Sequence, residues 1–120
     1  MLAGDAAHVN NPIGGMGLNG GIQDGANLAD KLLRIILGDE GDRLLDLYSR
    51  QRRTVAVEFV QEQSIANKQR LEAAEPDVRK RNFDELCAIA ADPARARAFL
   101  LRTSMITSQR RADALALEEA

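Results

Sequence analysis

Apolar positions along most of the chain recur at helical spacing. Within residues 18–36 they fall four, seven or eight positions apart, which predicts a helix with one buried face. Gly38 follows the last of these positions and suits the place after a helix, where the backbone often turns left-handed. The apolar and small residues of this face are Ile22, Ala26, Ala29, Leu32, Leu33 and Ile36.

Residues 42–106 carry the same spacing in three further segments. Asp42 is a good N-cap and begins a helix that we expect to end near Leu71. Pro76 disfavours helix at the residue before it, so a third helix follows this break. Asp92 and Pro93 are typical of a cap and a first helical residue, and they begin a fourth helix that includes Ile106. The apolar face of the third helix consists of Phe83, Leu86, Cys87 and Ala90.

The beginning of the chain has a different composition. Seven of the nine glycines occur by Gly25, together with one proline and two adjacent asparagines. This composition predicts a loop that leads into the helices. Residues 1–3 are the one strand signal and suggest the tip of a strand. We therefore divide the chain into residues 1–38, a loop with its following helix, and a helical region over residues 39–120.

Composition and charge exclude several classes of protein. The 120 residues suffice for about one domain, and their net charge of −2 gives no argument for nucleic acid or an anionic membrane as partner. A single cysteine, Cys87, excludes an internal disulfide framework and fits a cytoplasmic location; we expect it to be buried. No apolar run approaches the roughly 20 residues of a membrane span, and there is no secretory signal.

The glycine-rich loop combines two groups suited to one cofactor. At its start, the Asp5 carboxylate can accept hydrogen bonds from a sugar or polyol hydroxyl, while Gly4 lets a ligand approach the backbone. At its end, a helix begins near Gly17, Leu18 and Asn19 and offers unpaired N–H groups at the positive end of its dipole. Such a helix start favours anions and electron-rich carbonyl groups.

Residues 15–20, GMGLNG, also match the G-x-G-x-x-G pattern of dinucleotide-binding turns. That interpretation would require Gly15, Gly17 and Gly20 to surround a pyrophosphate. The pattern needs a hydrophobic strand that leads directly into its first glycine, whereas Asn10, Asn11 and Pro12 stand in this position. We treat the match as accidental.

Residues 2–32, LAGDAAHVNNPIGGMGLNGGIQDGANLADKL, resemble the second FAD-binding motif of class A flavoprotein monooxygenases, the para-hydroxybenzoate hydroxylase-like family. The motif combines GDAAH, a proline, GG-x-G-x-N, and Q-D followed by N-L. Residues 47–56 resemble, more weakly, the arginine-rich helix that follows in that family, and nothing diagnostic lies beyond about Leu71. The resemblance implies a mainly α chain: a loop plus about four helices, forming the C-terminal fragment of an α/β, glutathione reductase-like FAD-binding fold.

The resemblance also implies FAD as cofactor and gives roles to residues of the loop. Asp5 would bond a ribityl hydroxyl, and Pro12 would line the side of the flavin where substrate is oxidised. The helix start would direct its N–H groups at the N1 and C2 carbonyl edge of the flavin. Asn11 departs from the family, many members of which carry a second proline there. No side chain is implied as catalytic or as a metal ligand. The implied FAD-binding residues are Gly4, Asp5, Pro12, Gly15, Gly17, Leu18 and Asn19.

Members of that family use NADPH or NADH and dioxygen to hydroxylate a small substrate, commonly an aromatic one. Their N-terminal ADP-binding motif and substrate-binding sheet have no counterpart in this sequence. We therefore expect a truncated chain that is inactive and binds FAD weakly on its own. The apolar surface against which the sheet would pack predicts self-association.

The alternative hypothesis is a small helical protein that binds a partner through the apolar faces of its later helices and has no catalytic activity. Single residues also have structural interpretations. We expect His8 to be hydrogen-bonded within its turn and Asp24 to bond nearby backbone or a neighbouring helix. Arg50, Arg52 and Arg53 are interpreted as a solvated face, salt-bridged to Asp42, Asp46 and Glu58.

Overall fold

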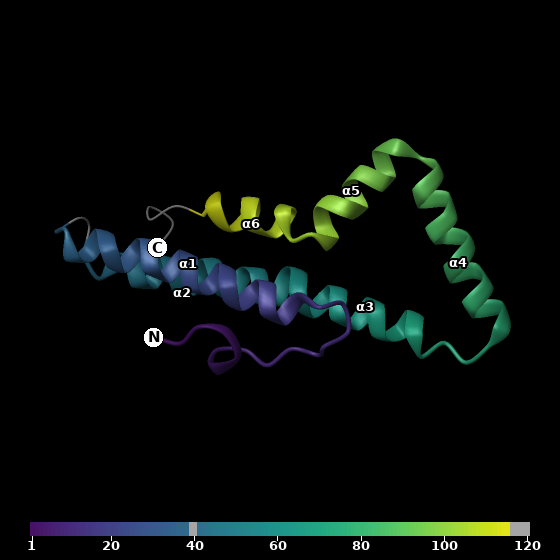
Figure 1. Ribbon diagram of the computed structural model, residues 1–120, viewed down its shortest axis with the longest axis horizontal. Helices are drawn as coiled ribbons and strands as arrows, with labels where there is room; N and C mark the ends of the chain where they lie inside the picture. The colour runs from purple at the N-terminus through teal and green to yellow at the C-terminus, as the bar shows by residue number, and fades with distance from the viewer. Residues whose placement is uncertain (39–40, 116–120) are drawn as a thin grey trace.

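The computed structural model describes residues 1–38 and 41–115, and this part of the chain consists of helices and loops without a strand (Figure 1). The prediction of a mainly α chain is confirmed. Ala3 has extended backbone, with φ −142° and ψ 152°, but residues 1–3 form no strand. The elements are the 3₁₀ turn η1 (Gly4–Ala6), α1 (Met16–Ile36), α2 (Arg43–Val55), the π-helix η2 (Ala56–Gln61), α3 (Glu62–Leu71), α4 (Pro76–Ala91), α5 (Pro93–Thr103) and α6 (Ile106–Asp113).

Two long helical segments form the body of the molecule. Helix α1 lies antiparallel to α2, which continues through η2 into α3 as one rod (Figure 1). Helices α4 and α5 leave the end of this rod and turn back, so that α6 lies along α2. The resulting molecule is elongated, 58 × 30 × 21 Å. The N-terminal loop runs beside α1 and α2, which form the frame for the site described below.

Helix ends follow the predicted signals more closely than the number of helices does. Gly38 has φ +92° just after α1, as predicted for a residue that terminates a helix. Asp92 caps α5, since its carboxylate accepts from the backbone N–H groups of Ala94 at 2.9 Å and Arg95 at 3.2 Å. The prediction that this last helix includes Ile106 is wrong. Met105 adopts a left-handed backbone, φ +63°, which separates α5 from α6.

The hydrophobic core lies between α2 and the elements that pack on it. Leu44 and Val55 of α2 are almost completely buried, and Val60 extends the core into η2. Met105 keeps its side chain buried despite its unusual backbone, and so joins α6 to this core. The other buried hydrophobic residues are Met16, Leu47, Tyr48 and Ala112.

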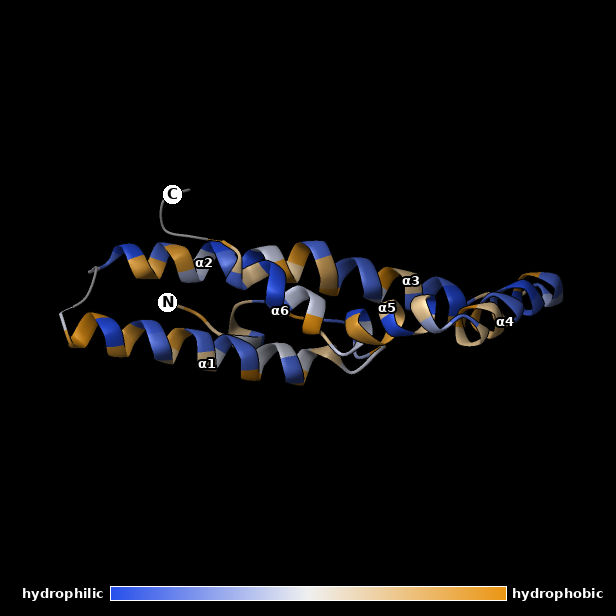
Figure 2. Cartoon of the chain, turned by 90° about the horizontal axis from the view of Figure 1, so that it is seen from above, coloured by the Kyte–Doolittle hydropathy of each residue, from blue (hydrophilic) through white to orange (hydrophobic). Residues whose placement is uncertain are grey.

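The predicted apolar face of α1 is exposed rather than buried. Ile22 and Ile36 are 62% and 79% exposed, and Figure 2 shows hydrophobic segments along the edge of α1 turned away from α2. The face of α1 turned toward the rest of the chain instead buries Met16, Gly20, Asp24 and Lys31. The apolar face of α4 is also open, since it buries no residue, and Cys87 is exposed rather than buried as predicted.

Polar side chains join α1 to α2 and α6. The ammonium group of Lys31 donates to the side-chain oxygens of Asn27 at 2.7 Å and Gln51 at 2.8 Å. The Gln51 amide in turn donates to the carbonyl of Ala112 in α6 at 2.9 Å. Burial lowers the pKa of Lys31, because the charged form loses its hydration. This network lies nearer the C-terminal end of α1, away from the glycine-rich loop.

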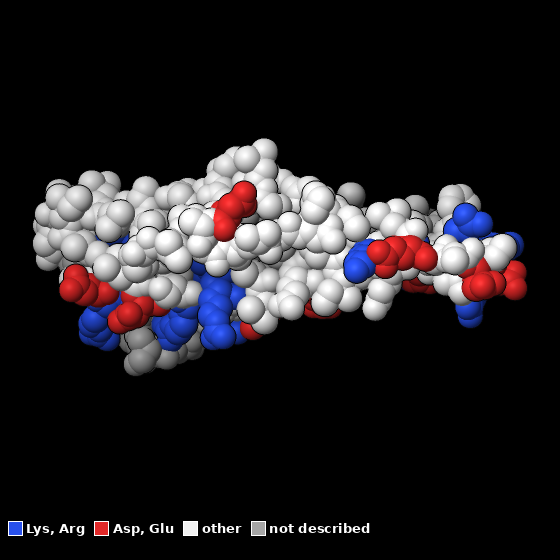
Figure 3. Space-filling model, turned by 90° about the horizontal axis from the view of Figure 1, so that it is seen from below, with Lys and Arg blue, Asp and Glu red and all other residues white. Residues whose placement is uncertain are grey.

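One face of the molecule carries charged side chains of both signs. The face seen in Figure 3 is mostly uncharged, with acidic and basic side chains in separate mixed groups rather than one basic tract. None of the helices in residues 1–38 and 41–115 combines the length and apolar character needed to cross a membrane.

Candidate functional site

A groove of about 650 Å³ lies between the N-terminal loop and the first turns of α1. Four of its lining residues are glycines, so much of its wall is bare backbone, while two side chains of α1 and one proline add an apolar part. Asp5 contributes the single carboxylate among them. The lining residues are Gly4, Asp5, Asn10, Pro12, Gly15, Gly17, Leu18, Gly21 and Ile22. We call this hollow the Asp5 groove.

The start of α1 forms one wall of the Asp5 groove. A tight turn precedes it, in which the Gly15 N–H donates to the carbonyl of Pro12 at 3.1 Å. Gly15 is the N-cap with φ +65°, a left-handed conformation that glycine adopts without strain. The N–H groups of Gly17 and Leu18 belong to the first helical turn and have no intrahelical acceptor. The groove therefore has hydrogen-bond donors at the positive end of a helix dipole.

The η1 turn forms the opposite wall and presents Asp5. Gly4 has φ +59°, and its carbonyl accepts from the N–H groups of Ala7 at 2.8 Å and His8 at 3.0 Å. The turn rests directly on α1, because a Cβ at Gly4 would lie only 3.6 Å from the Cα of Gly21. Asp5 stays exposed at the edge of the groove. The loop and the helix thus meet backbone against backbone.

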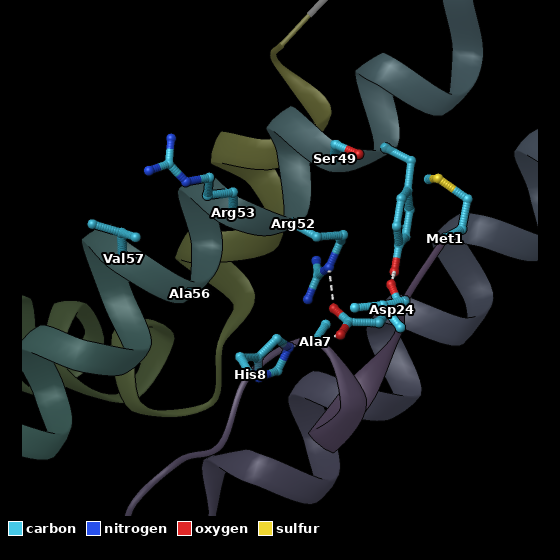
Figure 4. Close-up of a pocket in the computed structure, with 11 residues that line it drawn as sticks. Met1, Ala7, His8, Asp24, Ser49, Arg52, Arg53, Ala56 and Val57 are labelled. Carbon is cyan, nitrogen blue, oxygen red and sulfur yellow. Dashed lines mark hydrogen bonds and ion pairs between the residues drawn. The ribbon is translucent and has the colours of Figure 1, made fainter. Parts of the chain in front are cut away.

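A buried carboxylate beneath the loop holds these elements together. Asp24 is 1% exposed, and its Oδ2 accepts from the Gly4 N–H at 2.8 Å and from Nε2 of His8 at 2.7 Å. Its Oδ1 accepts from Nε of Arg52 at 2.5 Å. Figure 4 shows Arg52 reaching down from α2 to Asp24, with His8 on the other side of the carboxylate. One side chain of α1 thereby fixes both the turn and the neighbouring helix.

The surroundings of Asp24 keep it ionised. Burial on its own raises the pKa of this carboxyl, but the hydrogen bonds from Arg52, the Gly4 N–H and His8 outweigh burial and lower the pKa below its usual 3.8. The Arg52 guanidinium is itself 6% exposed, so the two opposite charges are buried as a pair. Removal of either partner would leave an uncompensated buried charge.

The hydrogen bonds continue from Asp24 to the Asp5 groove through His8. Nδ1 of His8 lies 3.1 Å from the side-chain nitrogen of Asn10, and Asn10 lines the groove. With Nε2 donating to Asp24, the geometry assigns Nδ1 as the acceptor of the Asn10 amide. The wall of the groove is thereby connected to a buried ion pair.

A second hollow, of about 470 Å³, lies on the α2 side of this network. It is lined by Met1, Leu2, Ala7, Tyr48 and Arg53, among others, and Figure 4 shows its residues. Inside it the Tyr48 hydroxyl donates to the carbonyl of Leu2 at 2.7 Å. Burial raises the pKa of this hydroxyl, so it remains a donor near neutral pH.

Six of the seven residues predicted to contact a cofactor line the Asp5 groove together. Asn19, which was predicted to contribute its backbone N–H, is not among the lining residues, and its side-chain amide donates to the Gly15 carbonyl at 3.3 Å. Our reading of the sequence missed Asn10, Gly21 and Ile22 as lining residues. Gly21 carried a usable signal, because it lies four residues after Gly17 and therefore one helical turn along the same face.

The interpretation of the arginines as one solvated face is wrong for Arg52, which is buried and pairs with Asp24. Figure 4 shows that Arg53 points away from this pair. Glu58 forms an ion pair at 3.6 Å with Arg111 of α6, which is not one of these three arginines. The expectation for Asp24 agrees with the structure, whereas His8 bonds Asn10 beside its turn and also reaches Asp24 of α1.

Two other kinds of site lack support in the part of the chain that the structure describes. Gly20, the last glycine of the G-x-G-x-x-G match, is buried with a would-be Cβ 3.8 Å from Cε1 of His8, and it does not line the groove with Gly15 and Gly17. Within residues 1–38 and 41–115, no group of three or more His, Cys, Asp or Glu side chains is arranged to hold a metal ion.

We expect acid to destabilise the chain through Asp24. Because its folded-state pKa lies below 3.8, the folded chain binds fewer protons than the unfolded chain between these two values. The stabilisation is therefore complete above the usual pKa and is lost as pH falls through the folded-state pKa. Urea midpoints measured from pH 6 to pH 3 should fall for the wild type and fall less for Asp24→Asn. An equally steep fall in both would assign the acid sensitivity to other carboxylates.

Comparisons with known proteins indicate the family of the chain. A family model described as an FAD binding domain matches residues 1–63. Para-nitrophenol 4-monooxygenase from Pseudomonas sp. (strain WBC-3) is 37% identical over 110 residues, which are 92% of this chain and 27% of that protein. Tetracenomycin A2 monooxygenase-dioxygenase from Streptomyces glaucescens is 46% identical over 75 residues, or 62% of this chain and 13% of that protein.

A third relative, rifampicin monooxygenase from Rhodococcus hoagii, is 42% identical over 86 residues, which are 72% of this chain and 18% of that protein. The chain thus spans between 13% and 27% of the length of these three relatives. No solved structure matches the chain.

Proposed function

Because the chain belongs to the FAD binding domain family, we propose that it is the FAD-binding part of a flavin-dependent monooxygenase and that the flavin end of FAD lies in the Asp5 groove. The observation that carries this proposal is the convergence of six residues, chosen from the sequence for FAD, on one groove. They come from two segments, the η1 turn and the start of α1 with its preceding turn.

The groove has the chemistry that a flavin requires. Gly15 and Gly17 leave backbone where a side chain would otherwise reduce the space, and a Cβ at Gly17 would point toward Cβ of Asn10, 4.0 Å away. Leu18 and Ile22 add apolar surface for a ring system, while Asp5 can accept from polyol hydroxyls. The residues present therefore fit the cofactor at its flavin and ribityl end.

When bound, FAD supplies the redox chemistry with electrons from a nicotinamide and with dioxygen. The role of the chain is to bind and orient FAD. The N–H groups of Gly17 and Leu18 would donate toward the pyrimidine edge of the ring, where the helix dipole would stabilise negative charge. Asp5 would accept from the ribityl chain, and Pro12 would limit access to the ring from the loop side.

The finer features of this proposal concern the whole enzyme. We propose NADPH or NADH as the electron donor, a small aromatic compound as the substrate and the cytoplasm as the location. The names of the relatives support this class of substrate, since one is a para-nitrophenol monooxygenase. Nitrophenol as the substrate is a property of that relative alone.

Asp5→Ala should raise the dissociation constant for FAD about 10- to 100-fold. Removal of the carboxylate takes away a charge-assisted hydrogen bond, which contributes about 1.5–3 kcal/mol. Titration of FAD with each chain, followed by flavin fluorescence, measures the change. Asp46→Ala serves as the control, because Asp46 is an exposed carboxylate of α2 that does not line the groove. Equal affinity of the Asp5→Ala and wild-type chains would contradict the proposed role of Asp5.

We further propose that the isolated chain self-associates through the exposed face of α1. Leu32, Leu33 and Ile36 are exposed large hydrophobic residues of this helix outside the Asp5 groove. Such a face is usually covered in a folded assembly. The sedimentation coefficient should therefore increase with protein concentration, and Leu33→Lys with Ile36→Lys should suppress the increase. A sedimentation coefficient independent of concentration would contradict self-association.

A further inference from the structure

We infer that Asp24 is the positioning residue for the Asp5 turn: its carboxylate, fixed by Arg52, holds Gly4 and His8 so that Asp5 faces the groove. This inference rests on the proposed function, because it gives Asp24 a task in flavin binding without contact to the cofactor. Asp24 itself does not line the Asp5 groove.

The donors around Asp24 come from both sides of the turn. The Gly4 N–H and the His8 ring, at 2.8 and 2.7 Å from Oδ2, bracket the residue between them that carries the Asp5 carboxylate. Two bonds that converge on one oxygen fix both the position and the rotation of this five-residue segment.

The carboxylate itself is held by α2. Arg52 donates from Nε to Oδ1 at 2.5 Å, and its Nη2 lies 3.4 Å from Oε1 of Gln23 and 3.5 Å from the carbonyl of Gly20. Both of these acceptors belong to α1. The guanidinium therefore spans the interface of α1 and α2 and sets the orientation of Asp24 relative to the loop.

Tyr48 supplies an independent restraint just before the turn. Its hydroxyl donates to the Leu2 carbonyl at 2.7 Å, two residues before Gly4. Tyr48 is 3% exposed and belongs to α2, like Arg52. Tyr48 consequently fixes the segment just before the turn, while Asp24 holds the turn itself at Gly4 and His8, and both restraints lead back to α2.

The close approach of Gly4 and Gly21 shows why this restraint affects the groove. A Cβ added at Gly21 would lie 3.5 Å from Cα of Gly4, an ordinary van der Waals contact, so the turn lies directly against α1 at these two glycines. Loss of the Asp24 bonds would remove the hydrogen bonds that keep the turn there, so that it could move outward, widen the groove and carry Asp5 away from the N–H groups at the helix start.

Amide hydrogen exchange tests this inference in the chain without cofactor. The N–H groups of Ala7 and His8 report on the turn, since both donate to the Gly4 carbonyl. In Asp24→Asn we expect their exchange to accelerate at least about tenfold relative to core amides of α2. Tyr48→Phe, which keeps the buried ring, should give a smaller acceleration at the same two amides with little change in melting temperature. Glu62→Gln, which removes an exposed ion pair with Arg102, is the matched control and should change neither.

Asp24→Asn and Tyr48→Phe should also bind FAD more weakly than the wild type at a temperature well below their melting points. For Asp24→Asn the dissociation constant should rise at least about fivefold. A purely structural role would lower the melting temperature without raising the dissociation constant of the folded chain. Unchanged exchange at Ala7 and His8, or faster exchange with unchanged FAD affinity, would overturn the inference. If the wild type binds no FAD, the proposed function fails, and the exchange of Ala7 and His8 alone decides whether Asp24 positions the turn.

Discussion

Replacement of Arg52 by methionine should lower the free energy of unfolding by about 3–5 kcal/mol. Methionine keeps part of the apolar length of the side chain but leaves the Asp24 carboxylate buried without its charged partner. Only the Gly4 N–H and His8 would remain as donors to it. Urea unfolding monitored by circular dichroism, compared with the wild type at neutral pH, measures the loss.

Two further chains show whether this loss belongs to the buried pair. Glu62→Gln removes an ion pair whose members are 39% and 67% exposed, and it should cost less than about 1 kcal/mol. The double variant Asp24→Asn with Arg52→Met should be more stable than Arg52→Met alone, because no buried charge is left unpaired. A loss below about 1 kcal/mol in Arg52→Met would mean that the pair does not hold α1 and α2 together.

Gly17→Asp should weaken FAD binding about 100-fold while the fold stays intact. A side chain at position 17 would extend toward Asn10 across the groove, and its negative charge would occupy the helix start that we assign to the flavin. A carboxylate in the first turn of a helix is otherwise favourable, by about 0.3–1 kcal/mol. Stability and affinity should therefore change in opposite directions, as seen by urea unfolding and by fluorescence titration.

Gly17→Ala is the matched control for this substitution. Its Cβ would lie 4.0 Å from Cβ of Asn10, an ordinary contact, and it introduces no charge. We expect at most a few-fold change in the dissociation constant. If the aspartate variant binds FAD as well as the alanine variant does, the start of α1 is not the flavin-binding wall.

Six of the residues selected from the sequence line one groove because the signals that selected them are local, and their contact with FAD stays a prediction. A positive φ, a free helix start and an exposed carboxylate each depend on a few adjacent residues, and Gly4, Asp5, Gly15, Gly17 and Leu18 all line one hollow. What connects these parts is not local. Asp24 and Arg52 are 28 residues apart, and nothing in the spacing of a single sequence indicates that they meet as a buried pair.

The orientation of α1 illustrates a second limit. Its apolar stripe correctly predicted a helix, yet Ile22, Leu33 and Ile36 are exposed while the polar Asp24 and Lys31 are buried. Periodicity identifies a face that favours burial but not the surface that covers it. Here the buried face is chosen by hydrogen bonds to Arg52 and Gln51, and the apolar face has no partner within the described residues.

The boundaries between the helices after α2 were the least predictable part of the fold. The π-helix η2 continues α2 into α3 without any break in the apolar pattern, so the sequence indicated one uninterrupted helix. Met105 separates α5 from α6 through a left-handed backbone, a conformation that glycine adopts far more often than methionine. Its buried side chain offers the reason, because the core compensates for local strain that a reading of sequence propensities does not include.

The central claim is that the flavin end of FAD lies in the Asp5 groove, and the most direct test is a titration of the ¹⁵N-labelled 120-residue chain with FAD followed by amide chemical shifts. This measurement detects even weak binding and identifies the residues involved. We predict saturable shifts at Gly4, Asp5, Gly17 and Leu18, reproduced by riboflavin and not by ADP. Shifts confined to other residues, or no shifts at these amides at saturating FAD, would contradict the account.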